Sequence, residues 1–152
     1  MSILSLASAQ SVYRGYEYYK AEKVIDLCPD GENRYRGTVS GSNGQVYQVA
    51  IDLEHPRRGS SCTCPHAAGR NIVCKHMVAL YFFLFPEEAR QYIDELEAYW
   101  AEEEQRCEEA EQALIRCVSQ MKKKELQQAL LQLLLDGPEW QYERFLRDYE
   151  IW

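Results

Sequence analysis

The sequence has no apolar run long enough to cross a membrane. A transmembrane helix needs about 20 mainly apolar residues, whereas the longest apolar run here, Met77 to Phe85, has nine. The first residues, Met1 to Ala9, are mildly apolar but contain no basic residue, so they do not resemble an export signal. We therefore expect a cytoplasmic protein with no membrane partner.

The sequence also lacks the motifs of common catalytic sites. It shows no Ser-His-Asp pattern, no paired-carboxylate motif and no glycine-rich phosphate loop, and it contains only three histidines. We therefore predict that the protein is not an enzyme.

Positive charge is scarce in the second half of the chain. Residues 1–80 contain nine Lys and Arg against seven Asp and Glu, whereas residues 81–152 contain eight against seventeen. Nucleic-acid binding draws much of its affinity from neutralised phosphates. Any contact with nucleic acid is therefore expected in the first half, and the net charge of −7 disfavours a polyanion as the general partner.

Four residues form two tight pairs of metal-ligand type. One residue separates Cys62 from Cys64, and one residue separates Cys74 from His76. Three thiolates and one imidazole are the ligands of closed, tetrahedral structural zinc sites, whereas catalytic sites keep one position open for water. We therefore predict a structural zinc ion. A disulfide is less favoured, because the first two cysteines are too close to bridge comfortably and a cytoplasm is reducing.

The spacing of each pair suits a single ion. On an extended strand, Cys62 and Cys64 point to the same face while Thr63 points away. Cys74 and His76 stand where an apolar, helix-like run begins, so the start of a helix can present them. Two alternatives remain open: the cysteines are simply buried small apolar residues, or His66 replaces His76 as a ligand.

The full pattern, C-x-C, nine residues and then C-x-H, resembles the motif of SWIM-type zinc fingers. The resemblance covers about residues 10 to 85 and includes Arg14-Gly15, Tyr18-Tyr19, Val24, Val39-Ser40-Gly41-Ser42, Tyr47-Gln48-Val49, Cys64-Pro65 and Cys74-Lys75-His76. It implies that Cys62, Cys64, Cys74 and His76 bind Zn²⁺. It also implies a protein-binding or DNA-binding part, because SWIM fingers occur in proteins that work beside ATPases, recombination factors and transposases.

The first half of the chain reads as a small antiparallel sheet. Residues 34–39 and 45–53 alternate like strands on either side of a Gly-Ser-Asn-Gly turn, and an earlier strand follows a short helical or irregular segment within residues 12–28. A fourth short strand is expected to carry Cys62 and Cys64. These patterns predict an α+β fold in which the sheet leads into a zinc-bound strand, loop and helix.

From Pro86 onward the sequence reads as helix. A long helix should be followed by one over residues 125–135 and another from about residue 138, as a helical hairpin or a three-helix extension. We therefore predict a SWIM-like domain over residues 1–85 and an acidic helical extension over residues 86–152. The long helix has a three-four apolar stripe that is expected to face its own hairpin or a second chain: Leu96, Trp100, Cys107, Ala110, Leu114, Cys117 and Met121. The stripe cysteines, and Cys28, are predicted to be packing residues.

Two functional hypotheses follow. The first is an interaction module in which a structural zinc supports a platform for a protein partner. The second is direct binding of DNA or single-stranded nucleic acid through the tyrosine-rich, basic first half. Four basic residues near the finger are the candidates for phosphate contacts: Arg57, Arg58, Arg70 and Lys75. We favour the first hypothesis; the partner and the oligomeric state stay open.

Overall fold

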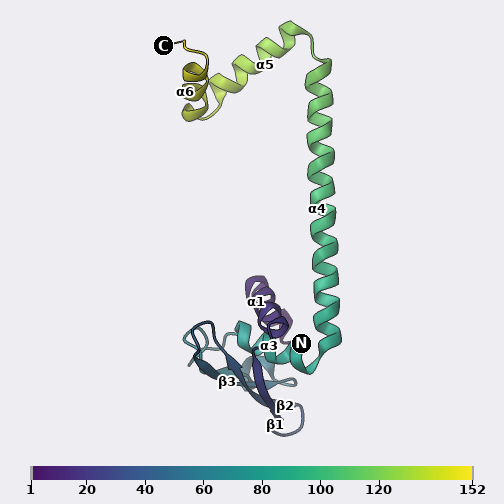
Figure 1. Cartoon of the computed structure of the whole chain (residues 1–152), viewed down its shortest axis with the longest axis vertical. Helices are drawn as coiled ribbons and strands as arrows, with labels where there is room; N and C mark the ends of the chain where they lie inside the picture. The colour runs from purple at the N-terminus through teal and green to yellow at the C-terminus, as the bar shows by residue number, and fades with distance from the viewer. Residues whose placement is uncertain (1, 152) are drawn as a thin grey trace. The chain divides into compact units, whose positions relative to one another are not determined.

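The computed structural model describes residues 2–151, which form two compact units dividing between Glu97 and Ala98. Unit 1 combines helices with one sheet, and unit 2 consists of helices (Figure 1). The predicted α+β fold class is confirmed. The predicted domain boundary after residue 85 stays a prediction, because one helix, α4, runs from Pro86 to Gln120 through the point where the units divide.

The sheet of unit 1 is antiparallel, with its four strands in sequence order. The turn between the second and third strands is closed by a 2.6 Å hydrogen bond from the backbone N–H of Gly41 to the carbonyl of Gln45, and Gly44 adopts the left-handed region at φ 73°. These strands confirm the predicted hairpin. The strands are β1 (Val24–Pro29), β2 (Arg34–Ser40), β3 (Val46–Asp52) and β4 (Ser61–Cys62).

The last strand is shorter than predicted, because β4 ends at Cys62 and Cys64 lies beyond it. β4 pairs with β3 only through Cys62 opposite Val49 and Ser61 opposite Ala50. Pro65 has no N–H to continue the ladder, and the backbone turns after Cys64. The first cysteine pair therefore straddles the end of a strand.

Helix α3 is the centre of the unit 1 core. It packs against α1 on one side and against the sheet on the other (Figure 1). Val78, Leu80 and Phe82 are fully buried in it. Gly15 of α1 allows the close approach of the two helices, because a Cβ atom there would lie 2.4 Å from Cγ1 of Val78. The other helical segments of unit 1 are short; the bounds are η1 (Leu4–Leu6), α1 (Ala9–Lys20), α2 (Pro56–Gly59) and α3 (Lys75–Leu84).

Unit 2 contains the end of α4 followed by α5 (Lys123–Asp136) and α6 (Glu139–Asp148). The three-helix form of the predicted extension is confirmed. Helix α4 ends next to the three lysines that precede and begin α5. Here the backbone N–H of Lys122 donates a 2.9 Å hydrogen bond to Oε2 of Glu125. Helix α5 begins two residues earlier than predicted. None of the helices in the described part of the chain has the length and apolar character to cross a membrane.

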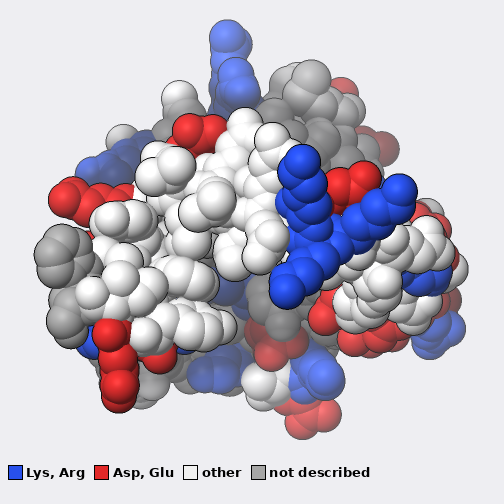
Figure 2. All heavy atoms as spheres, turned by 90° about the horizontal axis from the view of Figure 1, so that it is seen from above, with Lys and Arg blue, Asp and Glu red and all other residues white. Residues whose placement is uncertain are grey.

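Unit 2 leaves many apolar side chains exposed. Of its described residues, only Leu134 is buried, while Leu114 is 63% exposed and Leu135 is 73% exposed. Seen from above, uncharged side chains gather in a broad area next to Lys and Arg side chains (Figure 2). The prediction that Cys28 is a packing residue is wrong, since it is exposed; Cys107 and Cys117 are also exposed in the single chain, so their packing against a second chain stays a prediction.

Candidate metal centre

The two cysteine-histidine pairs come from two different elements of unit 1. Cys62 ends β4, where it lies opposite Val49 of β3, and Cys64 follows two residues later. Cys74 is the N-cap of α3, and His76 lies in the first turn of the same helix. The sheet thus presents one pair and the helix presents the other, as the spacing predicts.

The four side chains meet at one buried point. One donor atom from each residue lies within 4.8 Å of the other three. Nδ1 of His76 lies 3.7 Å from Sγ of Cys62 and 3.9 Å from Sγ of Cys74. Bonds of about 2.3 Å to sulfur and 2.0–2.1 Å to nitrogen would let one tetrahedral ion reach donors at these separations. All four residues are at most 4% exposed, so the donor set fits a closed metal site.

The thiols of Cys62 and Cys74 influence each other's pKa. A hydrogen bond from Cys62 lowers the pKa of the Cys74 thiol, and the same bond raises the pKa of Cys62. The backbone N–H of Cys64 also lies 3.4 Å from Sγ of Cys62. Because zinc binds the thiolate form of cysteine, the lowered pKa favours Cys74 as a ligand, and binding by the Cys62 thiol would release a proton.

Two tyrosines flank the imidazole of His76. The ring of Tyr47 lies 4.7 Å from it and the ring of Tyr18 lies 5.3 Å from it, between centroids. Nε2 of His76 is buried and has no hydrogen-bond partner among the residues that the structure describes. The imidazole therefore directs Nδ1 toward the cysteines and is held largely by aromatic packing.

The residues between the donors turn outward. Thr63 is exposed, and its Oγ1 accepts a 3.0 Å hydrogen bond from the backbone N–H of Gln48. This confirms that Thr63 points away from the two cysteines beside it. His66 is exposed and lies outside the four-residue cluster, so the alternative in which it replaces His76 does not match the structure.

The four basic candidates do not line a common hollow. Arg57 and Arg58 lie in α2 and line a shallow hollow with Leu6, while Lys75 lines a separate hollow beside the finger. That second hollow, of about 360 Å³, also contains Arg14 of α1. Arg70 is exposed in the loop before α3. A role for these residues in nucleic-acid binding stays a prediction.

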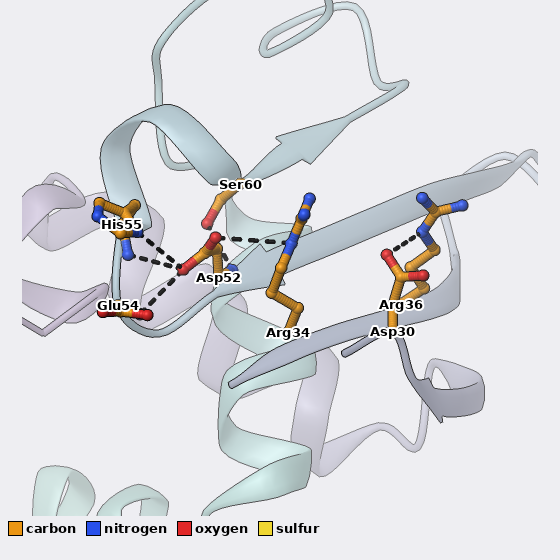
Figure 3. Close-up of polar contacts among 7 residues, drawn as sticks. All are labelled: Asp30, Arg34, Arg36, Asp52, Glu54, His55 and Ser60. Carbon is orange, nitrogen blue, oxygen red and sulfur yellow. Dashed lines mark hydrogen bonds and ion pairs between the residues drawn. The ribbon is translucent and has the colours of Figure 1, made fainter. Parts of the chain in front are cut away.

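A buried carboxylate at the end of β3, that of Asp52, was not predicted (Figure 3). Oδ1 of Asp52 accepts hydrogen bonds from the backbone N–H groups of Glu54 at 2.9 Å and His55 at 2.7 Å. Arg34 lies 3.5 Å from Oδ2, and the backbone N–H of Asp52 donates to Oγ of Ser60 at 3.1 Å. The hydrogen bond from His55 is the largest cause of the lowered pKa of Asp52. This network holds the segment that leads into β4. An aspartate directly before a turn is the sequence feature that could have predicted it.

A small sheet and a helix that bring four buried donors together define a zinc-binding module. Residues 47–84 match the family model of the SWIM zinc finger, in agreement with the predicted resemblance. The match and the donor chemistry together identify Zn²⁺ as the cofactor. The chain matches no curated protein and no solved structure.

Proposed function

We propose that Cys62, Cys64, Cys74 and His76 hold one structural Zn²⁺, and that the chain is a protein-binding module without catalytic activity. The observation that carries the proposal is the closed donor set, since four buried protein donors leave no ligand position for water or substrate. When bound, Zn²⁺ supplies the bonds that join the end of β4 to the start of α3. A cytoplasmic location, which stays a prediction, would keep the thiols reduced.

The protein-binding role is supported by the surface of unit 2. Leu131, Leu135 and Trp140 are each between 59% and 73% exposed. Large exposed apolar areas on a folded protein commonly mark contacts with another protein. The net negative charge of residues 81–152 disfavours a nucleic acid as the partner of this surface.

Nucleic-acid binding is the second candidate, and one observation favours it. The hollow beside the finger is lined by Arg14 and Lys75, and Nζ of Lys75 lies 4.3 Å from the centre of the Tyr18 ring. Cationic side chains next to an aromatic ring suit a phosphate and a stacked base of a single strand. The hollow combines these groups within residues 1–80, where Lys and Arg outnumber Asp and Glu.

Metal content tests the zinc site. Native mass spectrometry of the full chain, purified without added metal, should show one zinc ion per chain. Cys74→Ser should lose the ion, whereas Cys28→Ser should retain it because Cys28 is exposed and outside the cluster. A metal-free chain that still unfolds cooperatively would overturn the proposed site.

Salt dependence separates the two candidate functions. If the chain is a protein-binding module, a fluorescent single-stranded oligonucleotide should bind the full chain only weakly at 50 mM salt. Replacing Arg14 or Lys75 should not change that weak binding. Phosphate-driven binding would instead be clear at 50 mM salt, fall steeply by 200 mM and weaken in Arg14→Gln and Lys75→Gln. That result would favour the nucleic-acid function over the protein-binding one.

A further inference from the structure

The part of α4 that lies in unit 2 carries a seven-residue repeat. From Trp100 to Met121, the residue directly after α4, positions separated by three and four residues in turn are apolar, with one exception, Glu103. A repeat of 3.5 residues drifts around a straight helix of 3.6 residues per turn, so it matches a helix that supercoils with a partner helix. We call these positions the seam: Trp100, Glu103, Cys107, Ala110, Leu114, Cys117 and Met121.

The seam is exposed in the structure. Leu114 is 63% exposed, and Cys107, Ala110 and Cys117 are exposed as well. Val118, which borders the seam, is 42% exposed. A coiled-coil repeat that extends over three heptads and is exposed to solvent is expected to bind a partner helix.

The charges beside the seam select the orientation of the partner. With Trp100, Cys107 and Leu114 at the first heptad position (a), Arg106 occupies position g and Glu111 the following position e. In a parallel pair of identical helices, g of one helix lies next to the following e of the other, so Arg106 would lie opposite Glu111 of the second copy. In an antiparallel pair, e positions face each other and would bring acidic side chains together.

We propose that residues 100–120 of α4 form a parallel, in-register, two-stranded coiled coil with the same residues of a second copy of this chain. Glu103 is the polar residue of the seam, and Arg106 forms an ion pair with it within the helix. A polar side chain in a seam lowers stability but fixes the register of the two helices. Glu108 and Glu109, at the outward positions b and c, stay in solvent.

This proposal deepens the protein-binding part of the proposed function and rests on it, while the zinc site is independent of it. Zinc content and chain mass are therefore measured on the same samples by native mass spectrometry and sedimentation equilibrium. The full chain should form a dimer with one zinc ion per chain. A monomer, trimer or tetramer that still binds one zinc ion per chain would overturn the coiled coil and leave the zinc module intact.

A matched pair of substitutions locates the interface. Leu114→Asp should weaken dimerisation at least tenfold, because it places a charge in the seam. Ile115→Asp should change it less than threefold, because Ile115 points outward at position b and is 57% exposed. Equal weakening by both variants would overturn the proposed interface. Unchanged zinc content and helical circular dichroism would show that both variants are folded.

Charge reversal tests the parallel orientation. Arg106→Glu and Glu111→Arg should each weaken the dimer, and the double variant should recover most of the wild-type affinity. Residues five apart on one helix do not face each other, so recovery reports a contact between two chains. A double variant that is no stronger than the weaker single variant would overturn the parallel arrangement.

Disulfide cross-linking provides an independent test of the register. In a parallel, in-register pair, Cys107 of the two copies face each other. Diamide, which takes up the two electrons and two protons lost by a pair of thiols, should therefore join Cys107 to Cys107 through one S–S bond, as peptide mapping would show. Cross-links between Cys107 and Cys117 alone would overturn the proposed register and indicate antiparallel helices.

Discussion

The ring of Tyr47 lies against the imidazole of His76, with centroids 4.7 Å apart and 34° between the ring planes. Tyr47 belongs to β3 and pairs with Val39 of β2, so the sheet positions the ring that contacts the histidine. Oη of Tyr47 donates to Oε1 of Gln45 at 2.5 Å, which fixes the ring in turn. The sheet therefore orients a donor that belongs to the helix.

Replacing Tyr47 by alanine should speed the loss of zinc to a competing chelator. Partners that orient a metal-binding histidine typically change metal affinity by about 10- to 100-fold, and we expect the lower end because Tyr47 makes a packing contact. A colorimetric chelator assay measures the rate of zinc release. Tyr99→Ala, at a residue of α4 that is 57% exposed, is the control, and equal rates in the two variants would contradict the role of Tyr47.

Removing the metal should unfold unit 1. Binding of structural zinc contributes on the order of 10 kcal/mol in finger peptides, and here it joins the two elements that enclose much of the core. Near-ultraviolet circular dichroism should show that the environment of the unit 1 tyrosines is lost on chelation and restored when Zn²⁺ is added. A signal unchanged by chelation would mean that packing alone holds unit 1 together.

Replacing Asp52 by asparagine should lower the free energy of unfolding by about 1–3 kcal/mol, because two backbone N–H groups lose a charged acceptor. Urea unfolding of the zinc-bound chain measures the change. Asp30→Asn is the matched control, since Asp30 makes one exposed ion pair with Arg36 (Figure 3) and should contribute less than about 1 kcal/mol. Similar losses in the two variants would argue against a special role for Asp52.

The stabilisation by Asp52 should also depend on pH in a defined direction. Its pKa is lowered in the folded chain, chiefly by the hydrogen bond from the backbone of His55. The contribution is therefore complete above the unfolded value of about 3.9 and is lost as the pH falls through the lower folded value. The difference in unfolding free energy between wild type and Asp52→Asn should stay constant from pH 7 to 5 and shrink below pH 4. A difference that grows on acidification would contradict this sign.

Gly15→Ala should destabilise unit 1 although alanine favours helix. On an open helix the change would stabilise by up to about 1 kcal/mol, but the new methyl group would lie 2.4 Å from Cγ1 of Val78. We expect a net loss of about 1–3 kcal/mol from overpacking. The loss should be smaller when Gly15→Ala is introduced into a Val78→Ala background, as urea unfolding of the four chains would show. Additive effects would place the strain elsewhere.

Several parts of the fold are readable from the sequence because they depend on neighbouring residues. The alternation on both sides of the turn at Gly41 and Gly44 defines β2 and β3, and Pro86 with the acids after it marks the start of α4. The pairing of C-x-C with C-x-H likewise predicts which four side chains meet. In each case the spacing in the sequence determines the geometry.

Other features depend on packing between distant segments. Arg14 and Lys75 line one hollow only because α1 packs on α3 through Gly15, and the order of residues does not show that contact. The placement of Cys64 beyond β4 follows from a ladder that stops at Cys62. Periodicity showed that Cys107 and Cys117 share a stripe, but it does not specify what covers the stripe.

The short separation between the two donor pairs affects the order in which the protein can fold. Only nine residues lie between Cys64 and Cys74, and the entropy lost on closing a loop grows with its length. Capture of the ion by this segment therefore costs less entropy than bringing α1 onto α3, which joins residues about 60 positions apart. A nascent chain can thus acquire its metal once α3 has left the ribosome, before unit 2 has emerged from it.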